Sequence, residues 1–280
     1  MVHSKIASPS FIYLYGGAGA KSLDLGEIAR YLKETIGSTK VELRDEFITH
    51  ALSRLSPEGN GRAIGALAAR LANSKVRNPT IKDTDQDSML GEIEYEKRCL
   101  LNPKNKPFGI LYDGFKLQDV YFNLIPEPER EFSHLHIVIT NQLFGTWDEN
   151  DRRYHARVSV YGFPSIVSTT GIVEAPAKPR EFYLKRQLGI DLVTLKREFK
   201  GRFIDYDDPR LTEVVKGYMM QALFLHMMGD PFCEDKNCRL YNAHWQEEVI
   251  QAQLESNYEF CERHDEIIAQ LKEGKPWLRQ

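Results

Sequence analysis

The chain has 280 residues, of which 42% are hydrophobic and 28% charged, and its formal net charge is −3. This length can bury a large core in one domain or two, and the near-neutral charge gives no electrostatic reason to expect a nucleic-acid partner. No apolar run reaches the length of about 18 residues that a membrane-spanning helix needs, so we expect no membrane partner. The first ten residues lack the apolar segment of a signal peptide, which predicts a cytoplasmic protein.

The beginning of the chain predicts a β-α-β unit. Residues 11–15 (FIYLY) form a short apolar, β-favouring run that is typical of a buried strand. Residues 23–36 carry apolar side chains at helical spacing, and Gly37 ends this predicted helix. Residues 40–47 alternate like a strand, and residues 62–71 predict a second helix. This order is typical of a sheet covered by helices.

The middle of the chain predicts an insertion and further strands. Residues 78–130 are expected to be an insertion, since their first part is polar and rich in Lys, Asp and Asn. Strands are predicted at 108–112, 120–124, 134–140, 157–161 and 166–168. Two prolines in 173–180 exclude a central strand there. We predict one domain of mixed α/β (α+β) class over residues 1–280.

The last third predicts two helices. Asp208 and Pro209 are typical of a helix start, and Gly229 is a stop signal directly after Met228. Residues 249–269 predict the final helix. Upstream, residues 178–202 are locally basic, but acidic residues are interleaved with the cations, so we expect a solvated surface.

A glycine-rich segment at residues 15–22 (YGGAGAKS) follows a strand and precedes a helix, as a phosphate-binding loop does. That motif requires glycines where this chain has Tyr15 and Ala20, and the dinucleotide pattern G-x-G-x-x-G fails at Ser22. We therefore expect a plain turn, and nucleotide binding near Lys21 ranks third among the functional hypotheses.

The strongest chemical signal is a Cys-x4-Cys pair followed, 22 residues later, by Cys-x2-His: Cys233, Cys238, Cys261 and His264. Two such clips can close on one tetrahedral Zn²⁺ through thiolate and imidazole ligands. Three of the four cysteines lie in this segment, which predicts one structural zinc ion rather than disulfides. The alternatives are buried free cysteines or Cys99 as fourth ligand, although Cys99 lies in a charged stretch and is a poorer ligand than His264.

Residues 209–270 resemble the C-terminal part of the archaemetzincins, a family of zinc metallopeptidases. Their signature joins H-E-x-x-H-x-x-G-x-x-H directly to C-x4-C-x-M and ends in C-x-x-C. With Cys233 as the first cysteine, Gly229 falls on the family's glycine and His226 on its second zinc-binding histidine. The closing C-x-x-C corresponds to the clip in which His264 is the last ligand.

The same register also shows departures from the family pattern. Ala222 stands at the first catalytic histidine, Leu223 at the general-base glutamate and Phe232 at the third histidine. Leu240 replaces the methionine beneath the catalytic zinc. A catalytic zinc needs three protein ligands and an open position for water, and His226 alone cannot supply them. The resemblance therefore implies that the structural zinc site is kept while the catalytic site is lost.

The resemblance implies a metzincin/zincin-like fold, with a mixed sheet, covering helices and a C-terminal helical segment clipped by zinc. A strand at 157–161 would then border the former cleft. The first functional hypothesis is a non-catalytic pseudo-peptidase with a binding or regulatory role. Its partner would be a peptide, a protein or a small molecule held in that cleft.

The second hypothesis is a metallohydrolase with a relocated metal site. Polar residues that could contribute gather in segments expected to be loops, 145–155 and 169–176, where binding residues often lie. These residues are Asp148, Asp151, His155 and Glu174, which could act with His226. His134 and His136 share one strand face and are further candidates.

Overall fold

The structure is a computed structural model that describes residues 5–6, 8–16, 20–37, 39–54, 57–82, 88–102, 109–273 and 277–278. The chain divides into two compact units. We call residues 11–20 and 41–171 the sheet unit, and residues 1–10, 21–40 and 172–280 the helical unit. The predicted mixed α/β class is confirmed, while the predictions of one domain and of an insertion at 78–130 stay predictions.

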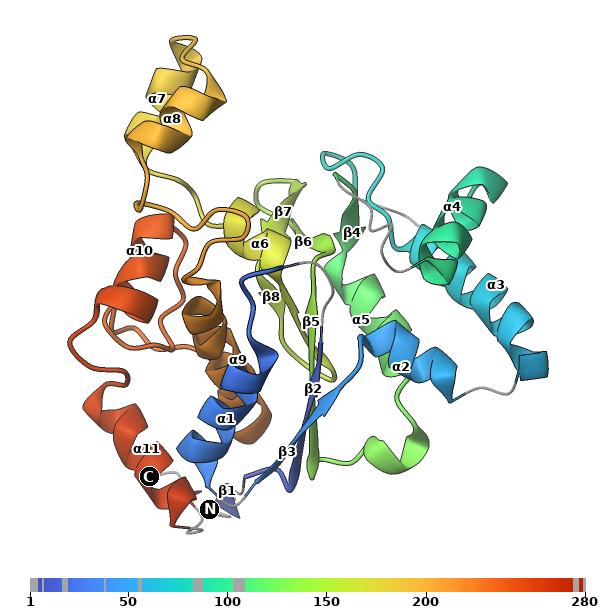
Figure 1. Cartoon of the computed structure of the whole chain (residues 1–280), viewed down its shortest axis with the longest axis horizontal. Coiled ribbons are helices and arrows are strands. Elements are labelled where there is room, and N and C mark those ends of the chain that lie inside the picture. The colour runs from blue at the N-terminus through green and yellow to red at the C-terminus, as the bar shows by residue number, and fades with distance from the viewer. Residues whose placement is uncertain are drawn as a thin grey trace. The chain divides into compact units, whose positions relative to one another are not determined.

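The sheet unit is built on a five-stranded sheet of order β3-β2-β5-β9-β8 (Figure 1). Its strands are β2 (Phe11–Tyr15), β3 (Lys40–Arg44), β5 (His134–Thr140), β8 (Ser159–Val160) and β9 (Ser165–Ser168). The neighbours β2, β5 and β9 are parallel, with Phe11 opposite His134, and β8 runs antiparallel to β9. The parallel strands have long buried runs, as expected of strands that are covered on both faces.

A second sheet of three strands, order β4-β6-β7, completes this unit. Its strands are β4 (Leu111–Asp113), β6 (Leu143–Asp148) and β7 (Arg153–Arg157). The helical elements of the unit are α2 (Phe47–Ser53), α3 (Pro57–Asn73), α4 (Leu90–Leu101), α5 (Gly114–Phe122) and the 3-10 turn η1 (Glu127–Glu129). The short helix α6 (Thr169–Glu174) spans the boundary between the two units in the sequence.

The predicted strand at 120–124 is wrong, because α5 covers most of it. Asp113 caps this helix by accepting hydrogen bonds from the backbone N–H groups of Phe115 and Lys116. Leu117, Val120 and Tyr121 are buried at helical spacing. Capping and burial on one face outweigh the β propensity of the segment.

The loop predicted at 145–155 is also wrong, because β6 and β7 form an antiparallel hairpin there. Trp147 lies opposite Tyr154, and their rings meet edge to face with centroids 5.4 Å apart. Asp148 closes the turn by accepting from the backbone N–H groups of Asn150 and Asp151. Paired aromatic side chains stabilise the hairpin although its turn is strongly polar.

The helical unit is centred on α9 (Leu211–Met228), most of whose side chains are buried. The other elements are α1 (Leu25–Ile36), α7 (Arg180–Gln187), α8 (Leu192–Glu198), α10 (Gln246–Ile250), a π-helical turn η2 (Gln251–Glu255) and α11 (Glu262–Lys272). Strands β1 (Lys5–Ile6) and β10 (Trp277–Leu278) pair antiparallel. Helix α1 packs against both α9 and α11. None of the described helices is both long and apolar enough to cross a bilayer.

The predicted boundaries of the last two helices are only partly right. Gly229 ends α9 as expected, with φ of 74° and its N–H bonded to the Leu225 carbonyl at 2.8 Å. The helix begins at Leu211 rather than at Pro209, and Asp208 holds the preceding turn by accepting from the N–H of Arg210 and pairing with its guanidinium. The predicted helix at 249–269 is broken between η2 and α11.

Two predicted features fall partly outside the described residues. They are the glycine-rich segment, of which residues 17–19 are not described, and the region 78–130, of which 83–87 and 103–108 are not described.

Candidate metal centre

The loop that follows α9 and the first turn of α11 bring together all four predicted ligands. Their ligand atoms lie within 4.8 Å of one another. The Sγ atoms of Cys233 and Cys261 are 3.8 Å apart, and Nδ1 of His264 lies 3.6 Å from Cys238 Sγ and 3.1 Å from Cys261 Sγ. In a tetrahedral site, Zn–S bonds of about 2.3 Å and Zn–N bonds of about 2.0 Å separate two sulfurs by roughly 3.8 Å and a sulfur from a nitrogen by roughly 3.5 Å. The donor set and the spacing therefore fit a zinc ion.

The first clip is a tight turn held by its own backbone. The N–H of Cys233 donates to the Leu240 carbonyl at 3.0 Å, and the N–H of Cys238 donates to the Asp235 carbonyl at 3.0 Å. The N–H of Asp235 points at Cys233 Sγ over 3.4 Å. Such N–H groups stabilise a metal-bound thiolate, because they face the charge that forms when the thiol loses its proton.

The second clip uses the start of α11. Cys261 is the residue before the helix, and the N–H of His264 donates to its carbonyl at 2.9 Å. One helical turn thus places the thiol and the imidazole side by side, at a helix N-terminus that favours negative charge. The ring of His264 is buried and meets Phe224 of α9 edge to face, with centroids 5.2 Å apart. This contact fixes the orientation of the imidazole.

Burial shifts the pKa values of three of the four predicted ligands. It raises the pKa of the Cys238 thiol to about 12, raises the pKa of Cys233 and lowers that of His264. The imidazole is therefore held in the neutral form that can bind a metal, and a metal ion must displace protons from the thiols. The structure brings the four residues together, and their occupation by zinc stays a prediction.

The positions that the family resemblance assigned to catalysis hold mostly apolar side chains. Ala222 and Leu223 are 0% exposed in the middle of α9, and Leu240 is also fully buried. Phe232 is 38% exposed, and His226 lies partly buried in the last turn of α9. Only His226 keeps a side chain that can bind zinc.

The polar residues proposed for a relocated site are largely engaged in local structure. Nε2 of His155 pairs with Asp151 at 2.8 Å within the β6–β7 hairpin, where Asp148 closes the turn. Glu174 accepts a hydrogen bond from Tyr206 Oη at 2.9 Å. Within the part of the chain that the structure describes, the Cys/His group is the only convergence of three or more His, Cys, Asp or Glu ligands.

His136 belongs to a buried polar network that the sequence analysis did not identify. The hydroxyl of Tyr15 lies 2.9 Å from His136 Nδ1, and His136 Nε2 lies 3.0 Å from the Glu129 carbonyl. Arg44 donates to the Tyr15 hydroxyl and binds the Glu129 carboxylate through two hydrogen bonds of 2.7 and 3.0 Å. Burial lowers the pKa of His136 to about 4. This histidine is a satisfied interior residue, because both ring nitrogens have protein partners.

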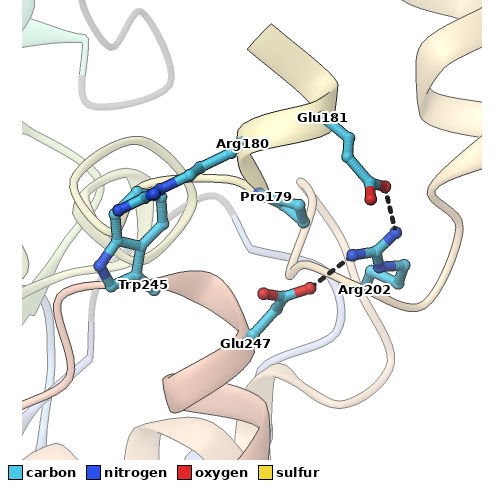
Figure 2. A pocket seen from close by; sticks show the side chains of 6 residues that line it. All are labelled: Pro179, Arg180, Glu181, Arg202, Trp245 and Glu247. Carbon is cyan, nitrogen blue, oxygen red and sulfur yellow. Dashed lines mark hydrogen bonds and ion pairs between the residues drawn. The ribbon is translucent and has the colours of Figure 1, made fainter. Parts of the chain in front are cut away.

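A cavity of about 270 Å³ lies in the helical unit beside α7 and α10, and it too was not predicted. Figure 2 shows Arg202 between two carboxylates, 3.2 Å from Glu181 and 2.6 Å from Glu247. On another wall the guanidinium of Arg180 lies over the Trp245 ring, 5.6 Å from its centre. The cations and carboxylates balance, so the cavity has no net charge with which to attract an ionic ligand.

Comparisons with known proteins place these features in context. A family model described as "Probable metallopeptidase family (DUF6775)" matches residues 8–271. No curated protein matches the chain. Among solved structures, the chain is similar to the crystal structure of archaemetzincin (amzA) from Methanopyrus kandleri, with a TM-score of 0.45 and 14% identity over 95% of this chain and 96% of that chain.

Proposed function

We propose that this chain, which belongs to the probable metallopeptidase family matched over residues 8–271, is a zinc protein that has lost peptidase chemistry and acts by binding another molecule. The observation that carries the proposal is the burial of Ala222 and Leu223 in α9. Zinc hydrolysis needs several ligands, an open coordination position and a general base. An alanine and a leucine with no solvent exposure supply none of these.

The proposed zinc ion has a structural role. Three thiolates and one imidazole fill a tetrahedral coordination shell, so no position is left for a reactive water. When bound, the ion joins the loop after α9 to α11 and holds the chain end against the core. This role needs no catalytic group and is therefore compatible with the apolar side chains of Ala222 and Leu223.

The proposed partner is a peptide, a protein or a small molecule. A net charge of −3 gives no support for a nucleic acid. A cytoplasmic location is part of the proposal, because a reducing environment keeps the three ligand cysteines available to zinc.

The first test is the zinc content per chain, measured by inductively coupled plasma mass spectrometry on untagged protein purified without added metal. We expect close to one zinc ion in the wild type and in Cys99→Ser, and almost none in Cys238→Ser. A fluorogenic peptide library should show no cleavage by any of the three. Close to two zinc ions, together with cleavage that a chelator abolishes, would contradict the proposal.

A metallohydrolase with a relocated site is the second candidate. The observation in its favour is the Asp151–His155 pair, since a carboxylate often orients a metal-binding histidine. It predicts a second metal ion and a hydrolase activity that His155→Ala abolishes. Unchanged metal content in this variant would exclude it.

A further inference from the structure

Helices α7 and α8 form a hairpin with a small core of its own. The two helices lie side by side (Figure 1) and pack mainly against each other. Their core consists of Phe182, Leu195, Phe199 and Phe203. The ring of Phe182 meets those of Phe199 and Phe203 edge to face, with centroids 5.6 and 5.7 Å apart. Of the aliphatic residues at the turn, Ile190 packs against this core.

Four aliphatic side chains at the turn are exposed, and we call them the apolar tip: Leu184, Leu188, Leu192 and Val193. Leu184 and Leu188 lie one turn apart, and Leu192 and Val193 begin α8 on the other side of Gly189. Leu188 is 82% exposed and Val193 78%. Single exposed aliphatic residues are common, but a cluster around one turn marks an interaction site.

The hairpin and its flanks carry a surplus of positive charge. Residues 178–202 contain eight Lys and Arg and three Asp and Glu, a net charge of +5 in a chain whose total is −3. The three acidic side chains are engaged locally. Glu181 pairs with Arg202, Glu198 pairs with Lys185, and Asp191 caps α8 by accepting from the N–H of Thr194. The acidic residues that suggested a balanced, solvated surface are therefore unavailable to the other cations.

Besides Arg180, which lies over Trp245, three exposed cations of residues 178–202 have no ion-pair partner among the described residues, and we call them the cationic collar: Arg186, Arg197 and Lys200. A helix of seven or eight residues is about 10–12 Å long. At a rise of about 1.5 Å per residue, Arg186 lies about 3 Å along the helix axis from Leu188, and Arg197 lies about 6 Å from Val193. Both distances are within one Debye length of about 8 Å at physiological ionic strength, while Lys200 follows the far end of α8. Long basic side chains can also extend along an apolar surface and place their charges at its polar boundary.

We propose that the α7–α8 hairpin docks on the surface of an anionic lipid bilayer, with the apolar tip among the headgroups and the cationic collar facing lipid phosphates and carboxylates. Aliphatic residues flanked by Lys and Arg are the composition that interfacial helices use. A fluid bilayer accepts an aliphatic tip without a shape-matched pocket, whereas a protein partner would have to provide one. The contact is peripheral, since no described helix can span the membrane.

The base of the hairpin contacts α10, which belongs to the same helical unit. Arg202 joins Glu181 of α7 to Glu247 of α10, and Arg180 lies over Trp245 (Figure 2). Docking of the tip would therefore also orient α10. None of the four predicted zinc ligands belongs to the hairpin, so the zinc proposal and the lipid proposal can fail independently.

The test is cosedimentation of the full-length, zinc-loaded chain with vesicles. We expect binding to phosphatidylcholine vesicles that contain phosphatidylserine, little binding to phosphatidylcholine alone, and weaker binding as salt is raised. The double variant Leu188→Ser/Val193→Ser should weaken binding by on the order of tenfold or more. Leu90→Ser is its matched control, because Leu90 is also 82% exposed but lies on α4.

The charge contribution is tested separately. Arg186→Gln/Arg197→Gln should weaken binding to the anionic vesicles by on the order of tenfold, since each basic residue near an anionic surface contributes several-fold. Arg30→Gln/Arg98→Gln removes two exposed cations elsewhere and should change little. Absence of vesicle binding would overturn the proposal, as would equal losses in the variants and controls. Binding of a polyglutamate peptide without vesicle binding would assign the surface to an acidic protein instead.

Discussion

The Cys/His group and the middle turns of α9 belong to the same compact unit but differ in chemical character. In the first, four ligand atoms lie within 4.8 Å of one another. In the second, Ala222 and Leu223 are fully buried and apolar. The difference teaches that the two clips bring polar ligands together whereas packing specifies the middle of α9, and a ligand group that joins two segments can stabilise the fold whether or not the protein catalyses a reaction.

The largest effect is expected from removing one ligand of the Cys/His group. Cys238→Ser should abolish zinc binding and with it a stabilisation that, in small zinc domains, is on the order of 10 kcal/mol. In this larger chain we expect a lower Tm and increased hydrogen exchange in α11, while the strands of the sheet unit stay protected. Thermal unfolding and hydrogen exchange measure this, with Cys99→Ser as the control. An unchanged Tm and zinc content would show that the group does not bind metal.

Introducing a charged group inside α9 should destabilise the fold nearly as much. Leu223→Glu places a carboxylate at a position with 0% exposure, and we expect a loss of about 3–5 kcal/mol in the free energy of unfolding. Phe232→His changes a position that is 38% exposed and should cost less than about 1 kcal/mol. Urea denaturation compares the two. A Leu223→Glu variant of normal stability would indicate that α9 borders solvent there.

His136 and His264 are both buried, but their surroundings differ. His264 is a predicted metal ligand, whereas both ring nitrogens of His136 have protein partners. Burial lowers its folded-state pKa from 6.5 to about 4, so the unfolded chain binds more protons between these values. Stability from this residue is therefore complete above pH 6.5 and is lost as the pH falls toward 4, by on the order of 3 kcal/mol. His136→Gln should flatten this part of the stability profile, measured by urea denaturation from pH 4 to 7. His134→Gln is the control, and an equal flattening in both would contradict the assignment.

The smallest effect concerns how tightly α9 is packed. A Cβ atom at Gly217 would lie 2.0 Å from Gln253 Oε1, and Gln253 is held by a 2.9 Å hydrogen bond to the Arg239 carbonyl. Gly217→Ala should therefore destabilise by about 1–3 kcal/mol, although Ala normally favours a helix. Gly65→Ala in α3 has open space around the new methyl group and should stabilise by up to about 1 kcal/mol. If Gly217→Ala were also stabilising, the packing between α9 and η2 would be looser than described.

The sequence by itself determined those features that depend on a few consecutive residues. The spacing Cys-x4-Cys and Cys-x2-His predicted the four residues that converge, because a tight turn and one helical turn are encoded within each clip. Gly229 marked the end of α9, since a left-handed residue suits glycine. The apolar runs at 11–15 and 134–140 were recognised as strands for the same reason: their patterns lie within a few consecutive residues.

Other features were decided by tertiary structure. The segment at 120–124 favoured a strand by composition, and the cap at Asp113 together with burial of one face made it a helix. The acidic residues around α7 and α8 predicted a surface of balanced charge. In the structure each of them has a local partner, which leaves other cations of the segment without an acidic neighbour to pair with. The network of Tyr15, Arg44 and His136 joins residues far apart in the chain. Sequence patterns report local geometry, whereas burial, ion-pair partners and networks depend on which distant segments meet, and only the folded chain determines that.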